Sequence, residues 1–121
     1  MKRLLLPLIA ALALPTAVNA NYFPDLEVQP QDYLEWFHIG NVTGNGGMLC
    51  TQFVAGDLIL ERAVYYRDGI LRRYKKEGER AEKVSIAGFN RGIEAMQSLS
   101  MKNNRQELKG LFDKCEQLKI N

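Results

Sequence analysis

The single histidine of this 121-residue chain, His38, limits the acid–base chemistry open to it. A serine-type catalytic triad would need His38 as its base, together with a serine on a tight turn such as Gly-x-Ser-x-Gly. The chain has no such motif, and His38 instead follows Trp36 and Phe37. A histidine next to aromatic residues is typical of a half-buried packing position, so the pattern favours a structural role for His38.

Two carboxylates near the histidine, Asp32 and Glu35, are the next candidates for chemistry. Paired carboxylates can cleave glycosidic bonds, but a spacing of three residues on a short amphipathic turn is more typical of a solvated face. Cys50, Cys115 and His38 do not supply the four ligands of a structural zinc site. We therefore expect no catalytic residue, no cofactor and no metal. A small envelope hydrolase or lysozyme-like enzyme is the alternative.

The basic run "ERAVYYRDGILRRYKKEGERAEK" is the segment best suited to binding. On a helix, one side of this run would hold Arg62, Tyr65, Arg72, Arg73 and Lys76. Arginines offer forked, weakly hydrated donors and tyrosine offers a stacking face, so together they form a platform for anions. We expect an envelope partner or a polyanion here, such as lipid head groups, acidic polysaccharide or an acidic protein surface. The alternative is a solvated face paired with Glu61, Asp68 and Glu77, or with the acidic N-terminal half of the chain.

The charge of the chain is distributed unevenly between its two halves. Residues 21–61 contain six acidic residues and no Lys or Arg, whereas residues 62–121 contain 14 basic and eight acidic residues. Removing Lys2 and Arg3 from the 16 basic residues leaves 14 against 14 acidic ones, so the chain from residue 21 has a net charge near zero. The asymmetry indicates either an anion-binding half or two halves that attract each other.

The first twenty residues, "MKRLLLPLIAALALPTAVNA", have the pattern of a secretory signal peptide. Two positive charges precede an apolar run, and Val18-Asn19-Ala20 forms a small-residue cleavage site. The run is short for a membrane anchor, which needs about 20 apolar residues, and no comparable run follows in the mature chain. We expect export to the periplasm or beyond, where nucleic acid is not a target. The leader resembles those of small exported proteins of marine cyanobacteria, and this resemblance, confined to residues 1–20, implies a bacterial source.

Two cysteines, Cys50 and Cys115, remain in the mature chain. In an exported protein an even pair predicts a disulfide. The bond would close a loop of about 65 residues, which is worth roughly 4 kcal/mol in the chain-entropy account. For a single domain of about 100 residues this is a large part of the total stability.

The glycine-rich segment "GNVTGNGG", residues 40–47, does not match a phosphate-binding loop. Gly47 is followed by Met48 and not by lysine, and no buried strand precedes the segment. Before it, residues 31–40 offer one or two helical turns with aromatic residues on one side, and we expect Trp36 and Phe37 to pack on the core with His38 at the rim. We expect residues 21–47 to be an arm with this short helix and a flexible glycine-rich loop.

The remaining residues, 48–121, have the apolar spacing of a helical core. The spacing predicts helices near residues 48–55, 58–76, 86–99 and 104–118, separated by Gly56 and by the polar segment 77–82. Asp57 and Asn104 are the expected N-caps. Asp68-Gly69, between residues that favour strands, leaves a hairpin over residues 64–74 as an alternative. The chain is thus expected to be one all-α domain of four to five short helices with one disulfide. Its architecture resembles that of small periplasmic proteins such as acid-stress chaperones of the HdeA type.

Overall fold

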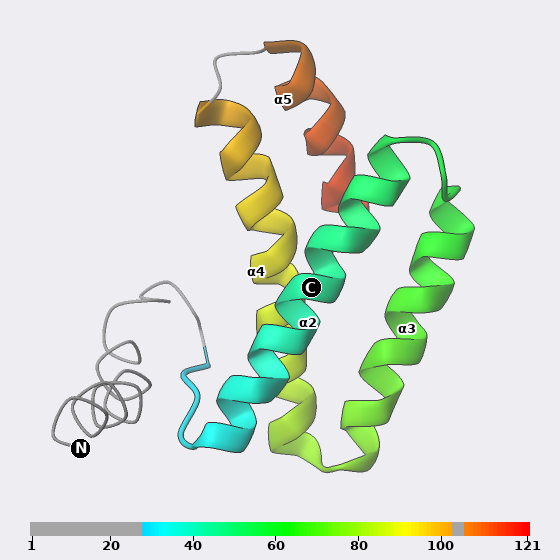
Figure 1. Ribbon diagram of the computed structural model, residues 1–121. Helices are drawn as coiled ribbons and strands as arrows, with labels where there is room; N and C mark the ends of the chain where they lie inside the picture. The colour runs from blue at the N-terminus through cyan, green and yellow to red at the C-terminus, as the bar shows by residue number, and fades with distance from the viewer. Residues whose placement is uncertain (1–27, 103–105) are drawn as a thin grey trace, which may run out of the picture.

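The computed structural model describes residues 28–102 and 106–121, and these are helical with no strand among them. The elements are α2 (Tyr33–Val54), α3 (Leu60–Lys76), α4 (Glu79–Lys102), α5 (Gln106–Asp113) and a 3-10 turn, η1 (Lys114–Leu118) (Figure 1). The predicted all-α class is therefore confirmed. The predicted signal peptide, residues 1–20, lies outside the described residues, as does the expected cap at Asn104.

Helix α2 is much longer than the sequence predicted. The Asp32 carboxylate accepts a hydrogen bond from the Glu35 amide at 2.8 Å and caps its N-terminus, and Gly56, with a φ of 84°, follows its C-terminus. The 22 residues of the helix include the whole glycine-rich segment 40–47. The expected loop and the expected helix end at Gly40 are wrong, because the segment lies in the middle of a helix.

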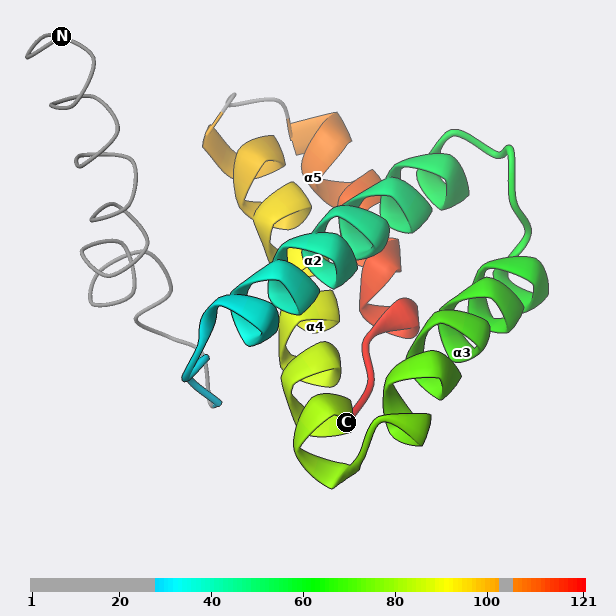
Figure 2. The ribbon, with the colours of Figure 1, turned by 60° about the horizontal axis from the view of Figure 1, so that its bottom comes forward.

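The glycines of α2 and α4 explain why this helix forms. The two helices cross closely, as Figure 2 shows, and a Cβ atom at Gly46, Gly88 or Gly92 would lie closer than 3.0 Å to atoms of the facing helix. The Thr43 hydroxyl donates a 3.0 Å hydrogen bond to the Gly88 carbonyl across this contact. Glycine inside a helix costs about 1 kcal/mol relative to alanine. Here the cost is offset because the two backbones can approach each other.

Helix α3 confirms the predicted helix in residues 58–76 and rules out the hairpin over residues 64–74. Its N-cap is Ile59, whose apolar side chain cannot accept a hydrogen bond from the first turn. The expected cap at Asp57 is therefore wrong. Only Glu77 and Gly78 separate α3 from α4, because Gly78 adopts a φ of 126° and turns the chain at once. The expected polar connection 77–82 is therefore mostly the first turn of α4.

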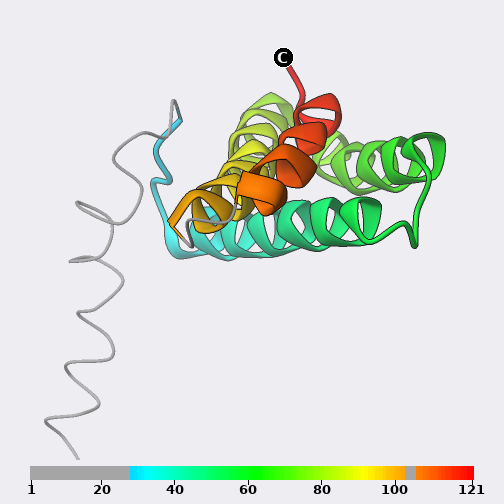
Figure 3. The same cartoon turned by 90° about the horizontal axis from the view of Figure 1, so that it is seen from above.

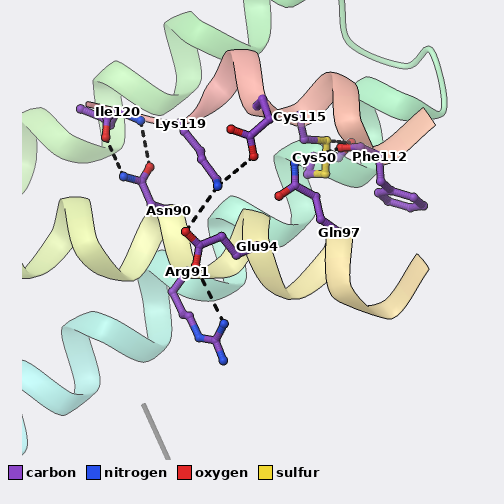
Figure 4. Close-up of polar contacts among 10 residues, drawn as sticks. Cys50, Asn90, Arg91, Glu94, Gln97, Phe112, Cys115, Lys119 and Ile120 are labelled. Carbon is purple, nitrogen blue, oxygen red and sulfur yellow. Dashed lines mark hydrogen bonds and ion pairs between the residues drawn. A yellow bond between two sulfur atoms is a disulfide. The ribbon is translucent and has the colours of Figure 1, made fainter. Parts of the chain in front are cut away.

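The C-terminal segment is fastened to the bundle by covalent and polar contacts. Cys50 and Cys115 form the predicted disulfide, with an S–S distance of 2.07 Å. The Asn90 side chain donates to the Ile120 carbonyl at 2.6 Å and accepts from its amide at 2.8 Å (Figure 4). Lys119 contacts two carboxylates, those of Glu94 and Glu116. The disulfide joins the C-terminal segment to α2, and the contacts of Asn90 and Glu94 join it to α4. The contact between Lys119 and Glu116 lies within the segment itself.

The core lies between α2, α4 and the C-terminal turn. Its fully buried side chains include Val42, Phe89, Ile93 and Leu118 together with the disulfide, and the inward side of α3 packs against them. Within the described ranges, no helix is both long enough and apolar enough to cross a membrane.

Candidate functional site

The outward side of α3 gathers the residues that the sequence nominated for binding. We call it the α3 outer face; it consists of Arg62, Tyr65, Tyr66, Arg72, Arg73 and Lys76. All six side chains are exposed, and they extend over 15 residues of helix, or about 21 Å. The opposite side of α3 packs on the core through its apolar residues, so this helix has one buried and one cationic side.

The cations of this face are not held in ion pairs among the described residues. Among residues 28–102 and 106–121, no ion pair involves Arg62, Arg72, Arg73 or Lys76. Within the described residues, these cations therefore do not form the alternative pairs with Glu61, Asp68 and Glu77, or with Asp32, Glu35 and Asp57 of the acidic half. Asp68 instead pairs with Arg67 at 2.9 Å and Glu77 with His38.

Two exposed tyrosines lie side by side in the α3 outer face. Tyr65 is 64% exposed and Tyr66 46% exposed, and their rings meet edge to face with centroids 5.8 Å apart. Sequence reasoning named only Tyr65. The signal for Tyr66 was its spacing of four residues from Arg62 and seven from Arg73, which places it on the same side of a helix.

A second candidate is the pocket around His38, where α2 begins and α3 meets α4. It has a volume of about 290 Å³, and its polar lining includes Asp32, Glu35, His38, Glu77 and Arg80. The His38 side chain is 14% exposed, and its Nε2 lies 3.3 Å from the Glu77 carboxylate. Glu35 binds Arg80 through both of its oxygens, at 3.0 and 3.2 Å. This is the concave arrangement of a histidine and carboxylates that a hydrolase would need.

The details of the pocket nevertheless fit a structural role better than a catalytic one. His38 faces Glu77 with one nitrogen, and its Nδ1 is buried with no hydrogen-bond partner among the described atoms. A general base must reach the proton that it removes; here one ring nitrogen is buried and the other faces the Glu77 carboxylate. The Tyr74 ring, whose centroid is 4.9 Å away, packs edge-on against the imidazole.

The two carboxylates of the predicted pair, Asp32 and Glu35, also have structural partners. Asp32 is the N-cap of α2, and the Arg80 guanidinium that binds Glu35 lowers the pKa of that carboxyl below its usual 4.5. A carboxyl with a lowered pKa is a poor proton donor near neutral pH. The pair therefore joins the start of α2 to the start of α4.

One expectation about the aromatic turn is wrong. Phe37, expected to pack on the core, is 55% exposed, whereas His38, expected at the rim, is the more deeply buried of the two. The reason is the longer helix: Ile39 and Val42 set the inward side of α2, and Phe37 faces away from it. Trp36 is half-buried.

A shallow groove of about 290 Å³ separates α3 from α4 and the C-terminal tail. Leu71, Ile86 and Ile120 form its apolar part, and Arg72 and Lys75 its cationic wall. Glu82 faces them from α4. Since Arg72 belongs to both sites, the groove borders the α3 outer face.

The described residues contain no cluster of three or more His, Cys, Asp or Glu side chains arranged to hold a metal ion. No protein-family description, curated protein or solved structure matches this chain.

Proposed function

We propose that this protein is exported, loses residues 1–20, and binds a polyanion or an acidic partner without catalysing a reaction. The α3 outer face carries the proposal. Four cations, Arg62, Arg72, Arg73 and Lys76, are exposed there, and no described carboxylate neutralises them. A face of this kind attracts anions and adds specific donors once they arrive.

The composition of the face supports binding beyond general electrostatic attraction. Tyrosine and arginine are the residue types that contribute most at binding hot spots, and Tyr65 and Tyr66 lie among the arginines. For an exported protein the available anions are lipid head groups, acidic polysaccharides and acidic protein surfaces. The proposal of a non-catalytic role is supported by the His38 pocket, where Nδ1 is buried and Nε2 faces the Glu77 carboxylate.

A binding experiment tests the proposal directly. The exported protein is titrated with anionic vesicles and with an acidic polysaccharide at ionic strengths from about 0.01 to 0.15 M, over which the Debye length falls from about 30 to about 8 Å. Binding should weaken steeply over this range. The double variant Arg72→Gln/Arg73→Gln should bind about 30-fold more weakly to vesicles, since each cation near an anionic surface contributes about 1 kcal/mol.

The matched control removes two exposed positive charges elsewhere, with Lys83→Gln/Lys114→Gln. This variant has the same net charge as the first but an intact α3 outer face, so its binding should stay close to that of the unmodified protein. Binding that does not depend on salt, or equal losses in the two double variants, would remove the support for a specific face.

A small hydrolase is the second candidate function, because the pocket does bring His38 together with Glu35 and Glu77. If the protein is a hydrolase, it should cleave an envelope polymer, and His38→Gln should abolish this activity without unfolding the protein. Under the binding proposal His38→Gln changes stability and leaves anion binding unaltered.

A further inference from the structure

The outward side of α2 is mostly apolar, although it faces solvent. We call it the α2 outer face; it consists of Tyr33, Leu34, Phe37, Gly40, Gly44 and Met48, with the exposed and uncharged Asn41 among them. Tyr33 is 75%, Leu34 60%, Phe37 55% and Met48 50% exposed. The spacing of Tyr33, Phe37, Gly44 and Met48, at i, i+4, i+11 and i+15, places them along one side of the helix.

This face carries no charge at all. Between Glu35 and Asp57 the chain contains no Asp, Glu, Lys or Arg, and the only titratable side chain there outside the disulfide, that of His38, turns inward to Glu77. Figure 3 shows α2 along one edge of the bundle, with the other described helices on its opposite side. An exposed helix normally has charged residues on its solvent side, and a contiguous apolar patch marks an interaction site.

We propose that the α2 outer face binds a second copy of this chain, as a two-fold symmetric dimer. A two-fold contact brings a surface against itself, so a patch with charges of one sign would meet charges of the same sign. The uncharged α2 outer face avoids this repulsion, whereas the α3 outer face would place arginines opposite arginines. The charge pattern therefore selects α2 as the side on which two copies can meet.

The distribution of bulk along α2 favours antiparallel pairing. The large side chains, Tyr33, Leu34 and Phe37, lie toward the N-terminus of the helix, whereas Gly40 and Gly44 lie at its middle. A Cβ atom at either glycine would meet no atom within 4 Å, so no contact among the described residues requires them. An antiparallel two-fold arrangement sets Phe37 of one copy beside Gly44 and Met48 of the other, large against small.

The area available predicts a weak dimer. Tyr33 and Phe37, partly exposed and each able to bury about 150–250 Å², leave roughly 250 Å² per copy for a partner. With the other residues of the face the area is on the order of 500 Å² per copy. The total of about 1,000 Å² is the lower end for a specific interface, so the dimer should be transient and concentration-dependent.

Sedimentation equilibrium of the exported protein over a wide concentration range tests the proposal. The expected result is a reversible monomer–dimer equilibrium. Phe37→Glu places an unpaired charge against the uncharged Gly44 and Met48 of the other copy and should weaken the dimer at least tenfold. The matched control is Tyr66→Glu, which puts the same charge on an exposed aromatic position of α3 and should leave the equilibrium unchanged.

A second variant separates dimerisation from folding. Gly44→Leu fills the gap that the partner's Phe37 would occupy, yet it replaces an exposed glycine by a better helix former. It should abolish the dimer while the melting temperature of the monomer rises. A protein that stays monomeric at every concentration, or a dimer that survives both substitutions, would overturn the proposal. A third outcome would also overturn the proposal: the monomer binds uncharged vesicles, and Phe37→Glu removes this binding. The α2 outer face would then contact lipid and not a second copy.

Discussion

Replacing Gly92 by alanine should destabilise this protein, whereas the same replacement at Gly44 should stabilise it. A Cβ atom at Gly92 would lie closer than 3.0 Å to backbone atoms of Thr43 and 3.1 Å from the Gly47 nitrogen. Backbone atoms of a packed helix cannot rotate aside as a side chain can. The variant must therefore push α2 and α4 apart along their whole contact.

The magnitude follows from three contributions. Overpacking a close contact costs about 1–3 kcal/mol, and separating the helices also weakens the 3.0 Å hydrogen bond from Thr43 to Gly88, worth about 1 kcal/mol. Alanine recovers about 1 kcal/mol of helix propensity. Gly92→Ala should then lose about 2 kcal/mol of unfolding free energy. Gly44→Ala meets no atom within 4 Å and should keep the propensity gain of up to about 1 kcal/mol.

Thermal and urea unfolding, followed by circular dichroism at low protein concentration, measure both variants. For a domain of this size each kcal/mol shifts the melting temperature by about 4–8 °C. Gly92→Ala should therefore melt about 10 °C lower, and Gly44→Ala several degrees higher. If the two variants melt at the same temperature, the glycines are not required by the contact between α2 and α4, and the explanation of the long helix α2 fails.

Two further predictions concern the links between distant parts of the chain. Cys50→Ser/Cys115→Ser opens a 65-residue loop and should lower the free energy of unfolding by about 4 kcal/mol, measured as a large drop in melting temperature. The unmodified protein, unfolded without reductant, should show no free thiol on titration. Two reactive thiols would refute the bond. Arg80 lowers the pKa of Glu35 below 4.5, so their contact contributes stability above about pH 4.5 and loses it as the pH falls through the folded-state pKa. Arg80→Gln should therefore melt lower than the unmodified protein at pH 7, with a difference that shrinks below about pH 4; a difference that is constant from pH 7 to pH 3 would refute the pairing.

The sequence predicted the helices whose inward sides are built from large apolar side chains. Ala63 and Leu71 in α3, and Phe89 and Ile93 in α4, have the spacing of three or four residues that a buried helix side requires, and they lie in or against the core. The disulfide was predictable for a different reason, since an even pair of cysteines in a chain that is expected to be exported has few alternatives. These predictions depend only on local spacing and composition, which is why they needed no knowledge of neighbouring helices.

The full length of helix α2 was not predicted, because glycine disfavours a helix when that helix is considered alone. The inward positions Ile39, Val42, Gly46 and Leu49 keep helical spacing straight through the glycine-rich segment. What the local pattern does not show is that α4 brings its own glycines to the same contact. The gain from close approach belongs to two helices far apart in sequence, so the preference of one segment could not reveal it.

The glycines of α2 differ in what requires them, and this difference bears on function. Gly46 faces α4, where a side chain would collide with the Phe89 carbonyl, so the fold alone explains it. Gly40 and Gly44 face solvent and each weakens the helix by about 1 kcal/mol, with no contact inside the described chain in return. A fold that only had to be stable would gain from a larger residue at both positions. The same argument applies to the exposed Phe37, which adds apolar surface to water without packing on the core. Each of these three residues is unfavourable in the isolated monomer and favourable in a close helix–helix contact with a second copy, and that is the physical reason for assigning the α2 outer face to an interface.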